Sequence, residues 1–257
     1  MDKLKGKIAV VTGGNSCVGV AVAQRLAADG AYVFIFARRP SEVDNVVKKV
    51  GKNVPKNVPK NVTGVEGDVA NVADLDRLYE AVKEKGGIDI LFANAALGEF
   101  APVRSVSEAH FDRTFGLNVK GLLFSVEKAV PLFREGGSII LNTAPSAGES
   151  VPAFSMYGAV KSAVRSFARC WTVELSARRI RVNVISPRPT QAYGLHGLGQ
   201  MDRLADQASL VAGLPFASAA APSAIANIAS ILASDDSSFI TGVEVFVDAS
   251  ARAMPAS

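Results

Sequence analysis

The sequence is poor in the residues that build disulfide frameworks and metal sites. Its 257 residues include two cysteines, Cys17 and Cys170, which form no CxxC pair, and two histidines, His110 and His196. A disulfide-rich secreted module needs several cysteines, and a zinc site needs closely spaced ligands. We therefore expect a protein of a reducing compartment that binds no metal.

The sequence also lacks the segments that mark membrane and nucleic-acid partners. No stretch reaches 18 uninterrupted apolar residues, and the opening residues MDKLKGKIAVV are not apolar enough for a signal peptide. No run of five basic residues occurs, although the net charge is +4 and the pI is about 9.1. We expect a soluble, cytoplasmic protein with no membrane or nucleic-acid partner. The mild positive excess by itself suits an anionic small molecule as well as it suits nucleic acid.

What the sequence does contain is a regular alternation of short apolar runs and segments with helical spacing. The apolar runs are unbroken, which is typical of strands buried on both faces of a parallel sheet. The expected strands are Lys7–Val11, Ala31–Ala37, Val62–Gly67, Asp89–Ala93, Ser138–Asn142, Arg181–Ile185 and Val243–Val247. The expected helices include Val20–Ala28, Ala73–Lys85, Glu108–Phe133 and Tyr157–Ser176. This alternation predicts an α/β fold: a Rossmann-type, doubly wound parallel sheet of about seven strands with ligands at the carboxyl ends of the strands.

A four-residue repeat follows the second expected strand. Lys52–Pro55 (KNVP) recurs as Lys56–Pro59, and Lys60–Val62 begins a third copy. Prolines at this spacing exclude a helix, so we expect a surface loop, with a basic docking loop as the alternative. No shift in composition marks a second domain, and residues 1–257 are expected to form one.

A glycine-rich segment lies between the first expected strand and the following helix. Thr12–Gly19 reads TGGNSCVG. Glycine lets the backbone turn tightly and approach a pyrophosphate, while the helix N-terminus offers free N–H groups and the positive end of its dipole. This context predicts a dinucleotide-binding loop.

The end of the second expected strand indicates which dinucleotide is bound. The strand ends in Phe36-Ala37-Arg38-Arg39, without an acid. A carboxylate there would bind the ribose 2′-hydroxyl of NAD, whereas an arginine would meet the 2′-phosphate of NADP. We therefore expect NADP(H), bound first by Arg38 and second by Arg39. Two solvated arginines are the alternative.

Tyr157 and Lys161 form a YxxxK pattern, which places both side chains on one face of a helix. A tyrosine phenol has a pKa near 10, and a neighbouring ammonium favours the phenolate. Such a pair can donate or accept a proton at a carbonyl oxygen while a nicotinamide carries the hydride.

These motifs together resemble the short-chain dehydrogenase/reductase family over nearly the whole chain. TGGNSCVG is similar to the family's TGxxxGxG loop, and Asn94-Ala95-Ala96 is similar to its NAG segment. The resemblance implies that Tyr157 is the catalytic acid/base, that Lys161 is its pKa partner and ribose anchor, and that Asn118 holds a water in the proton relay. It implies a cofactor site made of Gly13, Asn15, Ser16, Cys17, Val18, Gly19, Arg38, Arg39, Asp68, Val69, Asn94, Ala95, Tyr157, Lys161, Pro187 and Thr190. It also implies a substrate lid at 188–213 and a homodimer or homotetramer.

Four positions depart from the family's motifs. Cys17 stands at the second glycine of the loop, Ala96 at the glycine of NAG, and Arg188 at the glycine that follows Pro187. Ala144, 13 residues before Tyr157, replaces the serine that hydrogen-bonds the substrate oxygen in the family. Losing one such donor costs roughly 3 kcal/mol of transition-state stabilisation.

Two hydroxyl-bearing neighbours are candidates to replace the missing serine. In an extended chain Ser146 faces the same side as Ala144, whereas Thr143 faces the opposite side. Ser146 is therefore the expected catalytic substitute.

The sequence predicts an NADP(H)-dependent oxidoreductase that interconverts a ketone or other carbonyl compound and a secondary alcohol. Without the serine it would be slow, or its substrate would supply its own polarisation. The alternatives are a non-redox protein on the same scaffold, such as a cyclase, an isomerase or a cofactor-binding regulatory protein, and a structural subunit of an oligomer.

Overall fold

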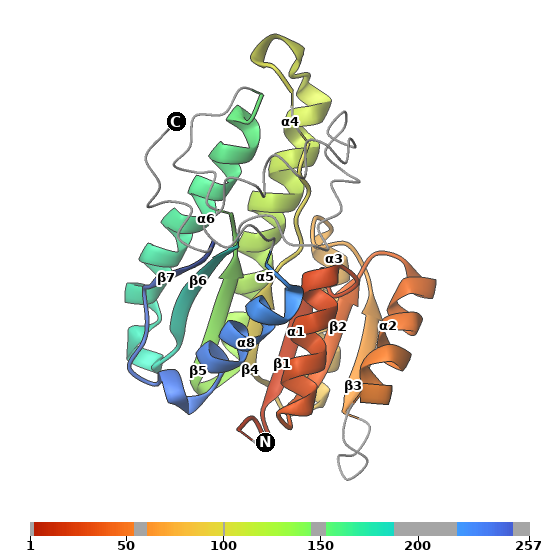
Figure 1. The fold of residues 1–257 in the computed structure, drawn as a ribbon, viewed down its shortest axis with the longest axis vertical. Coiled ribbons are helices and arrows are strands. Elements are labelled where there is room, and N and C mark those ends of the chain that lie inside the picture. The colour runs from red at the N-terminus through yellow and green to blue at the C-terminus, as the bar shows by residue number, and fades with distance from the viewer. Residues whose placement is uncertain (1–2, 54–60, 100, 145–152, 188–219, 249–257) are drawn as a thin grey trace.

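A parallel sheet runs through the middle of the molecule, with helices on both faces (Figure 1). The computed structural model describes residues 3–53, 61–99, 101–144, 153–187 and 220–248. Within these residues seven strands lie in the order β3-β2-β1-β4-β5-β6-β7, and each neighbouring pair is parallel. The strands are β1 (Ile8–Thr12), β2 (Tyr32–Ala37), β3 (Val62–Glu66), β4 (Ile88–Ala93), β5 (Phe133–Asn142), β6 (Arg181–Pro187) and β7 (Glu244–Val247). The predicted Rossmann-type fold is confirmed.

The helices divide between the two faces of the sheet. They are α1 (Cys17–Ala28), α2 (Pro40–Asn53), α3 (Val72–Glu84), α4 (Glu108–Phe115), α5 (Leu122–Ala129), α6 (Ser155–Glu174) and α8 (Pro222–Ala233). Helices α1, α2 and α8 cover one face, and α3, α5 and α6 cover the other. The chain leaves β1 toward β2 and β3, then returns to place β4 on the other side of β1. The strand order therefore reverses between β1 and β4, where open α/β sheets bind their ligands.

The helix expected over Glu108–Phe133 is divided in the structure. A π-helical turn, Gly116–Gly121, separates α4 from α5, and a 3-10 turn ends this part at Leu132. None of the described helices combines the length and the apolar composition needed to cross a bilayer.

Two elements were not anticipated from the sequence, α2 and α8. Helix α2 includes Lys52 and Asn53, so the first repeat begins inside a helix instead of a loop, while residues 54–60 lie outside the described part of the chain. Asn61, from the third repeat, is buried, and its amide donates to the carbonyls of Ala27 and Ala31. This asparagine joins the start of β3 to the end of α1, a structural role that the repeat pattern does not reveal.

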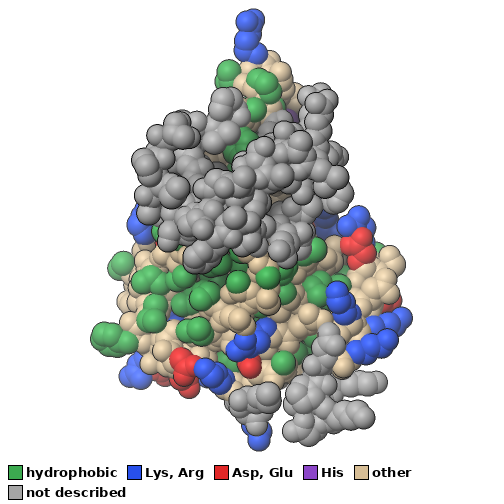
Figure 2. All heavy atoms as spheres, in the orientation of Figure 1, with side chains coloured by type: hydrophobic (Ala, Val, Ile, Leu, Met, Phe, Trp, Pro, Cys, Tyr) green, Lys and Arg blue, Asp and Glu red, His purple; other side chains and the backbone are tan. Residues whose placement is uncertain are grey.

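Several large apolar side chains remain exposed around the end of α6 and the turn before β7. Val173, Phe239, Ile240 and Val243 belong to this group, which we call the Phe239 patch. Figure 2 shows further hydrophobic side chains over α8 and β7 on the face in view.

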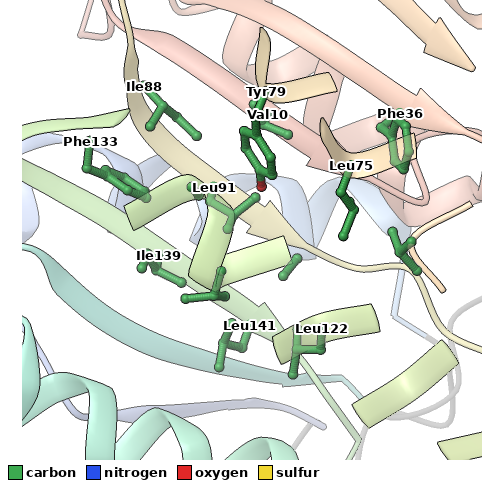
Figure 3. Packing of buried hydrophobic residues seen from close by; sticks show 14 of the residues in the cluster. Val10, Phe36, Leu75, Tyr79, Ile88, Leu91, Leu122, Phe133, Ile139 and Leu141 are labelled. Atoms are coloured by element: carbon green, nitrogen blue, oxygen red, sulfur yellow. The ribbon is translucent and has the colours of Figure 1, made fainter. Parts of the chain in front are cut away.

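The two hydrophobic clusters that fix the sheet lie one on each side of it. Figure 3 shows part of the larger cluster, in which side chains of β1, β4 and β5 pack against α3 and α5. Leu91 and Ile139 are fully buried there. Ile90 and Ile140, the neighbouring residues on the same strands, point to the opposite cluster beneath α1 and α8. Burial on both faces explains the unbroken apolar runs.

Candidate active site

The glycine-rich loop takes its shape from two glycines. Gly13 has a φ of +60°, and a Cβ there would lie 2.8 Å from the Cα of Ala95. A Cβ on Gly19 would lie 2.3 Å from the carbonyl oxygen of Gly13. Larger residues therefore do not fit at either position, because backbone atoms of the loop and of the segment after β4 occupy the space.

Cys17 does not strain the loop. Among the described non-glycine residues only Ala153 and Arg179 have positive φ, so Cys17 adopts an ordinary backbone conformation. It is the first residue of α1, after the cap Ser16, whose hydroxyl accepts the N–H of Gly19. The Cys17 side chain is exposed. The glycine that the family has here is thus not required by the backbone of this chain.

Asn94, at the end of β4, fastens the glycine-rich loop. Its amide Nδ2 lies 3.1 Å from the carbonyl oxygen of Gly13 and 3.0 Å from the hydroxyl of Ser16. Its Oδ1 accepts from the Nδ2 of Asn142 at 2.8 Å. The donors of Asn94 are therefore committed to the loop, and the residue shapes the site rather than offering free hydrogens to a ligand.

A cleft opens at the carboxyl ends of β1 to β4, at the point where the strand order reverses. The empty space in this cleft, counted together with the solvent at its open side, is about 650 Å³. The lining residues are Gly13, Asn15, Ser16, Phe36, Ala37, Arg38, Arg39, Gly67, Asp68, Val69, Asn94, Ala95, Ala96 and Leu117. Nine of the residues expected to bind the cofactor are in this set.

Two arginines and the carboxylate of Asp68 line the cleft, and a second carboxylate, that of Glu42, contacts one of these arginines. Arg38 is well exposed, and its Nη1 lies 4.0 Å from the carboxylate of Asp68. Arg39 is held more closely, since its Nε lies 2.7 Å from Oε1 of Glu42. The other oxygen of Glu42 accepts from Nδ2 of Asn15 at 2.5 Å. The sequence pattern did not single out Glu42, because it lies in the first turn of a helix that was not predicted.

Asn118 lies in the π-helical turn beside the cleft and holds the loop that follows β4. Its Oδ1 accepts the N–H of Leu97 at 3.1 Å, while its Nδ2 donates to the carbonyls of Leu97 and Thr114 at 3.0 and 2.8 Å. Both amide hydrogens are therefore used within the protein. The π-helical turn interrupts the regular i to i−4 bonding of the helix at this point, as such turns do at many functional sites.

Tyr157 and Lys161 lie in the first two turns of α6, which packs against the π-helical turn and β6. The Nζ of Lys161 lies 5.3 Å from the centre of the Tyr157 ring, and the ring of Phe154 meets Tyr157 edge-on. Lys161 is buried. Desolvation of the ammonium, with a smaller contribution from the nearby charge of Arg165, lowers the pKa of Lys161 to about 8.

Arg165 connects helix α6 to the segment in which Ala144 replaces the expected serine. Its Nη2 donates to the backbone carbonyl of Ala144 at 2.7 Å, and its Nε lies 2.8 and 3.0 Å from the two oxygens of Glu244. Ser186 donates to the same carboxylate at 2.5 Å. Helix α6, strands β6 and β7 and the segment after β5 therefore meet in one hydrogen-bonded, charged network.

The segments that follow β5 and β6 lie only partly within the described chain. Thr143 continues the pairing of β5 with β6, because its N–H bonds to the carbonyl of Ile185, and its buried hydroxyl has no partner among the described residues. Pro187 ends β6 and is buried. Ser146 and Thr190 lie outside the described residues, as do Arg188, His196 and the expected lid at 188–213.

Comparison with known proteins agrees with this geometry. Residues 13–250 match the family model for enoyl-(acyl carrier protein) reductase. The chain is 40% identical over 257 residues to Oxidoreductase asL5 of Sarocladium schorii, with 96% of each chain covered. It is 34% identical over 250 residues to dehydrogenase/reductase SDR family member 4 of Homo sapiens, with 96% of this chain and 87% of that protein covered.

Solved structures give the same result. A short chain dehydrogenase/reductase family protein aligns with a TM-score of 0.85 at 32% identity, over 99% of this chain and 100% of the other. A 3-ketoacyl-(acyl-carrier-protein) reductase from Brucella melitensis, complexed with NADH, aligns with a TM-score of 0.86 at 28% identity, over 96% and 99%.

Proposed function

The chain belongs to the short-chain dehydrogenase/reductase family of oxidoreductases, and we propose that it uses NADP(H) to interconvert a carbonyl compound and a secondary alcohol. The observation that carries the proposal is the cleft at the strand reversal, with Arg38 and Arg39 on its rim and the Tyr157–Lys161 pair on the neighbouring helix.

The residues of the cleft fit a nicotinamide dinucleotide. Gly13 lies tightly against Ala95 and Gly19 against Gly13, so the loop stays compact where Ser16, the N-cap of α1, lines the cleft. The first backbone N–H groups of a helix have no acceptor within the helix, and they favour an anion such as a pyrophosphate. In the same way the exposed guanidinium of Arg38 offers a planar, permanently charged donor to a 2′-phosphate.

In this proposal Tyr157 and Lys161 carry out the proton transfer at the substrate. A bound nicotinamide would supply or accept the hydride. Tyr157 would hold the proton at the substrate oxygen, and the ammonium of Lys161 would stabilise the phenolate left behind. Because the amide hydrogens of Asn118 are used within the protein, a relay water beside it would bond to Oδ1 or to backbone carbonyls of the π-helical turn.

The site lacks the serine that would donate a hydrogen bond to the substrate oxygen, because Ala144 occupies its position. We propose Ser146 as the substitute donor to the substrate oxygen. Thr143 continues the strand pairing through its N–H, and its buried hydroxyl is expected on the side opposite to Ala144, which leaves Ser146 as the favoured candidate. Ser146→Ala is then expected to lower kcat about a hundredfold, and Ala144→Ser to restore activity in that variant. An unchanged rate in Ser146→Ala overturns this assignment.

The remaining expectations concern the assembly and its location. We propose a cytoplasmic homodimer or homotetramer acting on a small molecule, since an exposed apolar group such as the Phe239 patch favours contact with another chain. The non-redox alternative is not favoured, because the similar proteins named above are described as oxidoreductases or reductases.

Titration of the purified protein with NADPH and NADH tests the proposal. Heat of binding and cofactor fluorescence give both dissociation constants, and turnover is then screened on ketones and secondary alcohols. We expect tighter binding of NADPH than of NADH, and we expect Tyr157→Phe to lose at least about a hundredfold in kcat while binding cofactor normally. Absence of binding of either cofactor at millimolar concentration overturns the oxidoreductase proposal.

A further inference from the structure

We propose that Glu42 limits the preference of this protein for NADP(H) by competing with the 2′-phosphate for the guanidinium of Arg39. The inference rests on the proposed cofactor site and assigns a selectivity role to a residue that lies outside the known sequence motifs of the site.

The geometry places the Glu42 carboxylate between two residues that line the cleft. One oxygen lies 2.7 Å from Nε of Arg39, and the other accepts from Nδ2 of Asn15 at 2.5 Å. Both partners line the cleft, Arg39 from the end of β2 and Asn15 from the glycine-rich loop. Glu42 therefore joins the two segments between which the adenosine end of a dinucleotide would lie.

Helix capping alone explains only part of this arrangement. The N–H groups of Glu42 and Val43 both bond to the carbonyl of Arg39, so α2 begins there and Glu42 lies in its first turn. A carboxylate in the first turn of a helix is favoured by the helix dipole. The bond from Asn15 contributes nothing to the cap, since it comes from a different element 27 residues earlier in the chain.

The charges on the rim then decide between the two cofactors. Arg38 faces Asp68 at 4.0 Å, while Arg39 is paired with Glu42 at 2.7 Å. Arg38 is thus the more available cation for a 2′-phosphate. For Arg39 to bind the phosphate, its ion pair with Glu42 must first break, and the negative charge of Glu42 also repels the phosphate.

The same carboxylate does not disfavour a cofactor that lacks the phosphate. A glutamate oxygen has lone pairs beyond the one used by each present partner, and it accepts a hydrogen bond from a ribose 2′-hydroxyl. Glu42 therefore weakens binding of NADPH and leaves binding of NADH unchanged or slightly stronger.

Glu42→Gln tests the proposal with little disturbance of the fold. The glutamine oxygen still accepts from Asn15, while the negative charge next to Arg39 is gone. We expect the dissociation constant for NADPH to fall about threefold to tenfold and that for NADH to stay within about twofold. The fragments adenosine 2′,5′-bisphosphate and adenosine 5′-monophosphate should show the same contrast, because the effect belongs to the adenosine end. Glu80→Gln, which removes an exposed carboxylate paired with Lys83 on α3, is the charge-matched control.

A double substitution separates competition for Arg39 from a general change in surface charge. Arg39→Gln should weaken NADPH binding less than about twofold in the wild-type background and more than about fivefold in the Glu42→Gln background. Equal effects in the two backgrounds, or a ratio of NADPH to NADH affinity that Glu42→Gln leaves unchanged, overturn the inference while the proposed function stands. Wild-type protein that binds neither cofactor overturns the proposed function itself.

Discussion

At Lys161, burial and a neighbouring charge shift the pKa of one residue of the site in the same direction. The side chain is buried close to the cation of Arg165, and both effects disfavour its ammonium form. The pKa of Lys161 falls to about 8, so the group is still mainly charged at neutral pH. Maintaining that charge reduces the stability of the folded protein, and the same charge is what the proposed chemistry of Tyr157 requires.

The depressed pKa predicts a stability that rises with pH. Between pH 8 and 10.5 the unfolded chain holds the Lys161 proton and the folded protein has released it, so the free energy of unfolding increases with pH in this window. Between pH 7 and 9.5 the gain from this group is about 2 kcal/mol. Urea unfolding at both pH values should show that gain in the wild-type protein relative to Lys161→Met, which lacks the group. An equal pH response of the two proteins contradicts the prediction.

At the residue scale, the sequence predicts the parts of the site that have fixed spacing. Gly13, Ser16 and Arg38 follow directly from the ends of predicted strands, and the structure places them in one cleft. The role of Glu42 could not be predicted from spacing, because its partner Asn15 lies on another element and is brought near only by the fold. Asn94 and Asn118 were expected as ligands of the cofactor and of a water, but their hydrogen bonds within the protein appear only when the loops are in place.

At the scale of elements, Arg165 and Glu244 hold the strand ends around the reacting site. The pair links α6 to β7. Nη2 of Arg165 also donates a hydrogen bond to the carbonyl of Ala144, just after β5. Both side chains are mostly buried, so removing one partner leaves the other with an uncompensated charge in a poorly solvated place.

This pair is expected to act as a unit in stability measurements. Arg165→Met and Glu244→Leu should each lower the free energy of unfolding by about 2–3 kcal/mol, and the double variant should lose clearly less than the sum of the two. Urea denaturation of the four proteins gives the coupling. Lys83→Met, which removes a partner from an exposed pair on α3, should change stability by less than about 0.5 kcal/mol. Additive losses for Arg165 and Glu244 would show that the two residues act independently.

Elements themselves were predicted where their apolar pattern is strong. Strands β1, β2 and β4 are close to their predicted bounds because their residues are buried on both faces. The π-helical turn within Glu108–Phe133 was missed, since one inserted residue hardly alters an amphipathic pattern. Helix α2 was not predicted, although Val43, Val46 and Val50 have helical spacing, because the proline repeat that follows directly is typical of a loop.

At the scale of the whole molecule, the Phe239 patch is an apolar surface that would remain exposed to water if the protein were a monomer. Val173 is 74% exposed and Phe239 is fully exposed, while Gly242 lies against Thr172 and brings the two parts of the patch together. Large apolar side chains at such exposure are costly in water and favour contact with another protein surface.

A charged residue introduced into this patch should cause the proposed oligomer to dissociate into monomers. We expect wild-type protein to elute as a dimer or tetramer in size exclusion with light scattering, and Phe239→Asp to shift toward the monomer mass. Val103→Asp changes an exposed valine outside the patch and should leave the mass unaltered. A monomeric wild-type protein, or a Phe239→Asp variant of unchanged mass, contradicts the assignment.

The central position of β1 in the sheet affects how the chain folds during its synthesis on the ribosome. This strand pairs on one side with β2, where Ala9 meets Val33, but its other edge is completed only by β4, where Ala9 meets Ile90. A ribosome adding about 5–20 residues per second needs several seconds to deliver that partner, and longer to free it from the exit tunnel. During that interval the nascent chain presents a bare, strongly apolar strand edge that can template pairing with other chains. Chaperone capture of the first ninety residues is therefore expected to govern how much of the protein reaches its native sheet.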